Sequence, residues 1–163
     1  MKLSAVVAMT VLGLRLSGCK TPKSKASREV LGTPERAVTR LVRAIEGGDT
    51  GMVMVQFPHE MDLGPYLSCA DSLRNGMNGL ARQLVDSPDG KAAKGTFSIF
   101  VSVELSNQRK VAPGPFEGDC KVLKEFELAD ADSTWDMDGA KHHFKVALIR
   151  LDGRWYPFDI PGM

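Results

Sequence analysis

The pattern of hydrophobic and polar positions changes character part-way along the chain. Up to about residue 86, apolar residues recur at three- and four-residue steps, as they do on one face of an amphipathic helix. From about residue 96, apolar and polar residues alternate, which is typical of strands with one buried face. Helices followed by an antiparallel sheet give an α+β fold, and a chain of 163 residues predicts a single domain of that class.

The first helix has signals at both ends. Thr33 is a favourable N-cap, Pro34 fits the first helical position, and Gly47-Gly48 ends the pattern. Asp49 can then cap a short second helix over about 50–56. The apolar stripe of the first helix consists of Ala37, Val38, Leu41, Val42 and Ile45.

A third helix is predicted over about 64–86, ended by the stretch 87–90. Gly76 and Gly79 lie inside it, and each costs about 1 kcal/mol relative to alanine. We expect these glycines to kink the helix or to let another element approach. Its apolar positions are Leu63, Tyr66, Leu67, Ala70, Leu73, Met77, Leu80, Ala81 and Leu84.

Four strands are predicted after Gly95. Asp152-Gly153 is a two-residue hairpin turn, and Pro157 places the last strand at an edge of the sheet. Phe100 interrupts the alternation of the first strand, which indicates a partly covered second face. That strand is expected to place Phe97, Ile99, Val101, Val103 and Leu105 on one face. The strands are predicted over about 97–105, 119–129, 141–151 and 154–160.

The beginning of the chain has the features of a bacterial export signal. An apolar run of twelve residues, 3–14, follows Met1-Lys2 and is shorter than the roughly 20 residues that span a bilayer. The next motif resembles the lipobox of bacterial lipoproteins at all four of its positions. That resemblance implies cleavage before the cysteine and a diacylglycerol on its sulfur; an ordinary secretory signal or a chance match is the alternative. The motif consists of Leu16, Ser17, Gly18 and Cys19.

The expected anchor divides the chain into a signal peptide at 1–18, the lipidated Cys19 with a flexible basic tether at 19–32, and a domain at 33–163. Several acyl chains hold a protein on a membrane without a spanning helix, because each buried CH₂ contributes about 0.8 kcal/mol. We therefore predict a cell-envelope location with the membrane as a partner. Lys20, in place of an aspartate after the lipid cysteine, favours the outer membrane by the same resemblance.

Two cysteines remain once Cys19 is assigned to lipid. An even pair in an exported protein favours a disulfide between Cys69 and Cys120, and two free buried thiols are the alternative. The sequence has no CxxC motif, and its histidines are not at ligand spacing with either cysteine. We therefore predict neither a metal nor a cofactor.

Two segments resemble small exported lipoproteins with an NTF2-like domain of the cystatin-like superfamily. The opening matches in Thr33-Pro34-Glu35, in the helix to Ile45, and in Glu46-Gly47-Gly48-Asp49. The ending, 151–159 (LDGRWYPFD), resembles their closing hairpin. The resemblance covers about residues 33–160 and implies helices packed into a strongly curved sheet. Such a cone often contains a pocket, and these domains often form dimers through the sheet.

Groups able to perform acid–base catalysis are present, but they match no catalytic pattern of those relatives. Neighbouring residues on a strand point to opposite faces, so His142 and His143 cannot readily share one substrate or metal. We expect one of them to be exposed and the other half-buried, and we predict no catalytic residue. The groups considered are Tyr66, Asp71, His142, His143 and Asp159.

The sequence predicts where the protein resides better than what it does. A net charge of +1 gives no case for nucleic-acid binding. The preferred interpretation is an envelope lipoprotein whose domain binds an envelope protein or a small apolar ligand without catalysis. The alternatives are an isomerase- or dehydratase-like enzyme with its pocket in the cone, or a structural protein acting through its sheet surface. A homodimer through the sheet is a further expectation.

Overall fold

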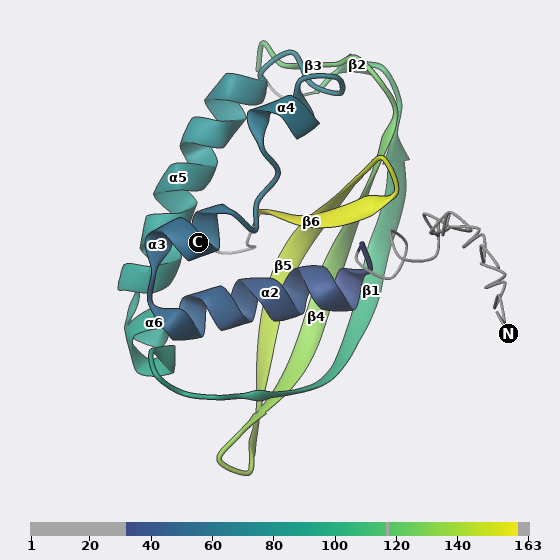
Figure 1. Cartoon of the computed structure of the whole chain (residues 1–163). Coiled ribbons are helices and arrows are strands. Elements are labelled where there is room, and N and C mark those ends of the chain that lie inside the picture. The colour runs from purple at the N-terminus through teal and green to yellow at the C-terminus, as the bar shows by residue number, and fades with distance from the viewer. Residues whose placement is uncertain (1–31, 117, 160–163) are drawn as a thin grey trace, which may run out of the picture.

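The computed structural model describes residues 32–116 and 118–159. The predicted signal peptide, Cys19 and the tether up to residue 31 lie outside the described residues. Within them, helices come first and a curved antiparallel sheet of four strands follows (Figure 1). The predicted α+β class is confirmed.

Local signals define the first two helices. α2 (Pro34–Gly47) begins at Thr33, whose side chain accepts the N–H of Arg36, and ends at Gly48 in the left-handed conformation, with φ 66°. α3 (Thr50–Met54) is capped by Asp49, which accepts two backbone N–H groups. Both predicted helices are confirmed, because caps and stop residues act within a few positions of themselves.

The third predicted helix starts later than expected. α4 (Glu60–Leu63) is a single short turn, and α5 (Ala70–Asp86) begins at the seventh residue of the predicted range, 64–86. Between them residues 64–69 form turns, and their backbone pairs with residues 121–123 through bonds from Leu123 N to Tyr66 O and from Ser68 N to Lys121 O. The buried side chains in and around this segment, Leu63, Tyr66, Leu67 and Ala70, nevertheless have the spacing of a helical face. Ser87 ends α5 as predicted, and it also caps α6 (Pro88–Ala93), which the sequence analysis missed.

The sheet has the strand order β1-β4-β5-β6, and β2 pairs separately with β3. The third and fourth predicted strands are confirmed, the fourth as an edge. The second is wrong: it divides into β3 and a much longer β4, whose buried positions include alanines and Ser133, which give a weak apolar pattern. The bounds are β1 Ile99–Val111, β2 Gly114–Pro115, β3 Lys121–Val122, β4 Phe126–Met137, β5 Ala140–Leu151 and β6 Arg154–Asp159.

The predicted buried face of the first strand is confirmed for Val103 and Leu105, which pack against the core, and is wrong for the residues before them. The register against β4 shifts between Phe100 and Ser102, so the side of the strand that meets the core changes there. Phe100 packs edge-on against Trp135, with ring centroids 5.3 Å apart. The first three residues of the predicted buried face are exposed instead: Phe97 by 78%, Ile99 by 61% and Val101 by 47%.

The core lies between the helices and the sheet, and α2 runs across the strands (Figure 1). At the predicted turn after β5, Asp152 and Gly153 both have positive φ, 47° and 79°, as a two-residue hairpin requires. The larger side chains that are almost fully buried include Val38, Leu41, Val53, Phe57, Leu63, Leu67, Val146, Leu148 and Ile149.

Candidate functional site

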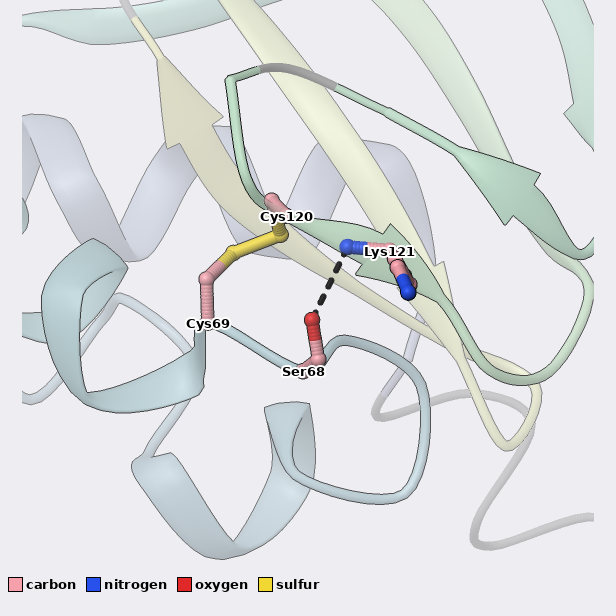
Figure 2. The surroundings of a disulfide bond; sticks show 4 residues. All are labelled: Ser68, Cys69, Cys120 and Lys121. Carbon is pink, nitrogen blue, oxygen red and sulfur yellow. Dashed lines mark hydrogen bonds between the residues drawn. A yellow bond between two sulfur atoms is a disulfide. The ribbon is translucent and has the colours of Figure 1, made fainter.

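Cys69 and Cys120 form a disulfide, as the sequence analysis favoured (Figure 2). Cys69 is the residue before α5, and Cys120 precedes β3, so the bond joins segments separated by 51 positions. Beside the disulfide, the N–H of Lys121 donates to Ser68 Oγ at 2.9 Å. The loop that carries β2 and β3 is therefore attached to the start of α5 both covalently and by backbone pairing.

Both cysteines line a cleft of about 1010 Å³ between α5 and the sheet, which we call the disulfide cleft. Its walls combine hydrocarbon with charge, so they suit a molecule that has both kinds of surface. The larger apolar lining residues are Leu73, Met77, Leu80, Phe116, Leu128 and Phe158. The charged ones are Arg109, Asp119, Asp130 and Asp159.

Gly76 and Gly79 of α5 also line the disulfide cleft. Helix α5 continues through both glycines, and a Cβ atom added at either would meet no atom within 4 Å. The expected close approach of another element is therefore wrong. Packing gives no reason for two residues that together cost the helix about 2 kcal/mol relative to alanine. What they do is leave the α5 side of the cleft open.

A second cleft of about 740 Å³ lies at the C-terminal end of α5, and we call it the tryptophan cleft. Elements α2, α5, α6, β4 and β5 all contribute to it. Its large apolar lining residues are Val42, Ile45, Leu84, Trp135, Met137 and Phe144. Its charged or titratable ones are Glu46, Asp89, Asp138, His142, His143 and Lys145.

The carboxylate of Glu46 is 6% exposed and is held on several sides. It accepts the backbone N–H of Ser98 at 2.8 Å, the Ser98 hydroxyl, and Arg43 Nη1. Arg43 also donates to the Ser98 carbonyl and lies 4.1 Å from the ring centroid of Phe97. Sequence reasoning missed this network. Its one local sign is an acidic residue in the last turn of a helix, where the dipole disfavours negative charge.

Tyr66, one of the groups considered for catalysis, belongs to a structural cluster. Its hydroxyl donates to Asp152 Oδ1 at 2.6 Å and accepts from Lys124 Nζ at 3.0 Å and from the backbone N–H of Asp152. These hydrogen bonds lower the pKa of the Asp152 carboxyl, chiefly through Tyr66 and then through Lys124. The pKa of Lys124 is raised, first by its bond to Tyr66 and then by its bond to Asp152. The cluster connects the segment before α5 to the β5–β6 turn.

The other groups considered for catalysis are scattered. Asp71 is exposed beside Glu60, and its hydrogen bond and charge raise the pKa of the Glu60 carboxyl. Asp159 lines the disulfide cleft, whereas His142 and His143 line the tryptophan cleft. Both histidines are exposed, so the expectation of one half-buried histidine is wrong: the β4–β5 hairpin projects beyond the helices (Figure 1). Apart from the two histidines, which line the same cleft, the structure does not bring these groups together.

Two searches of the described part of the chain are negative. No group of three or more histidine, cysteine or carboxylate side chains there could hold a metal ion. No helix there is long and apolar enough to cross a bilayer. Comparison of the whole chain with protein-family models, curated proteins and solved structures finds no significant match.

Proposed function

We propose that this protein is a lipid-anchored envelope protein whose folded domain binds a small amphiphilic molecule in the disulfide cleft without transforming it. The lipobox at 16–19 supports the anchor. The Cys69–Cys120 disulfide supports export, because disulfides persist in oxidising compartments and are rare in the cytosol. Together these observations favour the cell envelope, and Lys20 favours its outer membrane.

The domain is proposed to be of the NTF2-like type. The capped first helix, the further helices and the four-stranded antiparallel sheet occur in the order that the resemblance implies. The chain also closes with the hairpin at Asp152-Gly153. A cleft between helices and a curved sheet is where a domain of this type would hold a ligand.

The glycine-lined wall of the disulfide cleft is the observation that carries the binding proposal. The cleft has the size of a small-molecule site, with apolar walls and a few charged groups. Gly76 and Gly79 weaken α5 without any packing requirement, as expected where stability is sacrificed for a binding site. Binding is favoured over catalysis because the candidate acid–base groups are dispersed.

The anchor is tested on the exported product by its intact mass. We expect a chain that begins at Cys19 and carries a diacylglycerol, and we expect Cys19→Ala to abolish incorporation of labelled fatty acid. Lys20→Ala is the matched control, because it changes the adjacent residue and leaves the sulfur in place. Fatty-acid labelling that survives in Cys19→Ala would contradict the anchor.

The cleft is tested with glycine substitutions. Gly79→Leu fills the cleft with a good helix former, so we expect it to remove any mass retained in native mass spectrometry of protein extracted from the envelope. Gly47→Leu is the control: Gly47 is also helical, with no atom within 4 Å of the added Cβ, and does not line the cleft. A retained mass that Gly79→Leu leaves unchanged would contradict binding in this cleft.

The same glycines predict a gain in stability. Gly76→Ala and Gly79→Ala should each raise the free energy of unfolding by about 1 kcal/mol, because alanine is the better helix former and the added methyl group meets no neighbour. Urea denaturation measures this gain. A loss of stability in either variant would show that the glycine is required by packing, and the argument from α5 would fail.

A further inference from the structure

The buried polar side chains around the tryptophan cleft are already hydrogen-bonded inside the protein. The buried carboxylate of Glu46 is bonded to Ser98 and Arg43. Trp135 Nε1 donates to Ser133 Oγ at 2.8 Å, and that hydroxyl donates to the carbonyl of Phe144 at 2.8 Å. Across residues 32–116 and 118–159, no buried side-chain nitrogen or oxygen lacks a partner.

Because the buried polar atoms already have partners, they limit the class of ligand that the cleft can bind. A polar ligand would lose its hydration on entering and would find no free partner in the walls, which is unfavourable. A hydrocarbon surface gains from burial against Ile45, Trp135 and Phe144 without needing any partner. At about 740 Å³, the cleft lies within the range of small-molecule sites.

The rim adds a second constraint. Asp89 and Asp138 supply negative charge, and Lys145 supplies positive charge and lies 3.7 Å from Asp132. His142 also lines the cleft. Because both signs are present around the same opening, neither an anionic nor a cationic head group is selected. These groups can instead hydrate or hydrogen-bond an uncharged polar end.

We infer that the tryptophan cleft is a second binding site, separate from the disulfide cleft, for a small uncharged molecule made mainly of hydrocarbon, such as a medium-length alkyl chain with one hydroxyl at the rim. The molecule buries its chain between α2, α5 and the β4–β5 hairpin. Its polar end stays at the opening. This inference does not depend on what the disulfide cleft binds.

The probes are 1-hexanol, 1-octanol and 1-decanol, titrated into the unlipidated full chain made under oxidising conditions, so that no acyl chain competes. Trp135 is the reporter, and Trp155→Phe makes it the only tryptophan. If that variant does not fold, the two indole N–H signals in the NMR spectrum of the unaltered chain report instead. We expect the dissociation constant to fall about fifteenfold for each pair of added methylenes.

A substitution that fills the cleft tests the location. Ala92 is exposed on α6 and lines the cleft, so Ala92→Phe should weaken decanol binding by about tenfold or more. Ala112 is also exposed and lines neither cleft, so Ala112→Phe should leave the dissociation constant unchanged.

Four results would overturn the inference. The first is a dissociation constant that does not depend on the length of the alkyl chain, and the second is unchanged decanol binding in Ala92→Phe. The third is decanoate or decylammonium that binds more than about tenfold tighter than decanol, which would assign a charged ligand. The fourth is a dimer that Ala92→Phe converts to a monomer, which would show that a second copy of the chain covers the cleft. None of these results bears on the disulfide cleft, whose own test is the Gly79→Leu variant.

Discussion

The two clefts share the helix α5 but are held open by different means. At the disulfide cleft a covalent bond joins the loop before β3 to the start of α5, and the walls keep charged groups such as Arg109 and Asp119. At the tryptophan cleft a buried carboxylate, Glu46, joins the end of α2 to Ser98 just before β1. The carboxylate oxygens of Glu46 are therefore already hydrogen-bonded within the protein.

The difference shows how the means of support sets the chemistry of a cleft. A disulfide needs no charged partner, so charged side chains of the disulfide cleft such as Arg109 and Asp119 take no part in that covalent support. A buried charge is tolerated only when it is fully hydrogen-bonded, so the groups around it are not available. Both clefts have charged residues in their lining, but the buried carboxylate of the tryptophan cleft is already hydrogen-bonded, so the interior of that cleft offers a ligand mainly hydrocarbon.

Removing the disulfide should have the largest effect on the difference between the two clefts. Cys69→Ser with Cys120→Ser should lower the free energy of unfolding by about 4 kcal/mol, from the loop-closure estimate for a separation of 51 positions. Urea denaturation measures the loss. Hydrogen exchange should quicken in residues 114–123 and stay slow at Ser98, if the two clefts are supported separately. Equal loosening of both clefts would contradict the comparison.

Glu46→Ala tests the other support. It leaves the N–H and hydroxyl of Ser98 and the guanidinium of Arg43 without their partner, so we expect a loss of about 2–3 kcal/mol. Hydrogen exchange at Ser98 should quicken while residues 114–123 are unaffected. Glu35→Ala, an exposed glutamate of the same helix, is the control and should cost much less. Equal losses in the two variants would show that the network contributes nothing.

Tyr66→Phe measures how much non-covalent contacts contribute to the stability of the region around the disulfide. It removes a hydroxyl bonded to Asp152 and Lys124, and we expect a loss of about 1 kcal/mol at neutral pH. The loss of stability caused by Tyr66→Phe should be larger when the disulfide is absent, because the disulfide then no longer holds the same region in place. Equal effects in both backgrounds would show that they act independently.

The same variant should alter the pH dependence of stability. The Asp152 pKa is lowered from its ordinary 3.8, so its contribution is present above 3.8 and is lost as pH falls through the folded-state value. The Lys124 pKa is raised from 10.5, so its contribution is present below 10.5 and is lost as pH rises through the folded-state value. The difference between wild type and Tyr66→Phe should therefore be greatest between these limits. A difference that does not vary with pH would contradict the cluster.

Most of the errors in the sequence analysis come from residues whose partners are distant in the chain. The apolar spacing before α5 fits a helix, but pairing with residues 121–123 outweighs local preference there. The alternation from Phe97 to Leu105 predicts a single face, but the register shift opposite Trp135 reverses it. Alanines and Ser133 hide the length of β4, because small residues are buried only when another layer covers them.

Local sequence is enough to predict that helices precede strands, that Thr33 and Asp49 cap helices, and that Asp152-Gly153 forms a turn. These depend on backbone conformation and on side chains within a few positions. The bond between Cys69 and Cys120, the burial of Glu46 against Ser98 and the two clefts beside α5 follow from three-dimensional packing alone. Those features arise from contacts between residues about 50 or more positions apart, and no local pattern encodes such a distance.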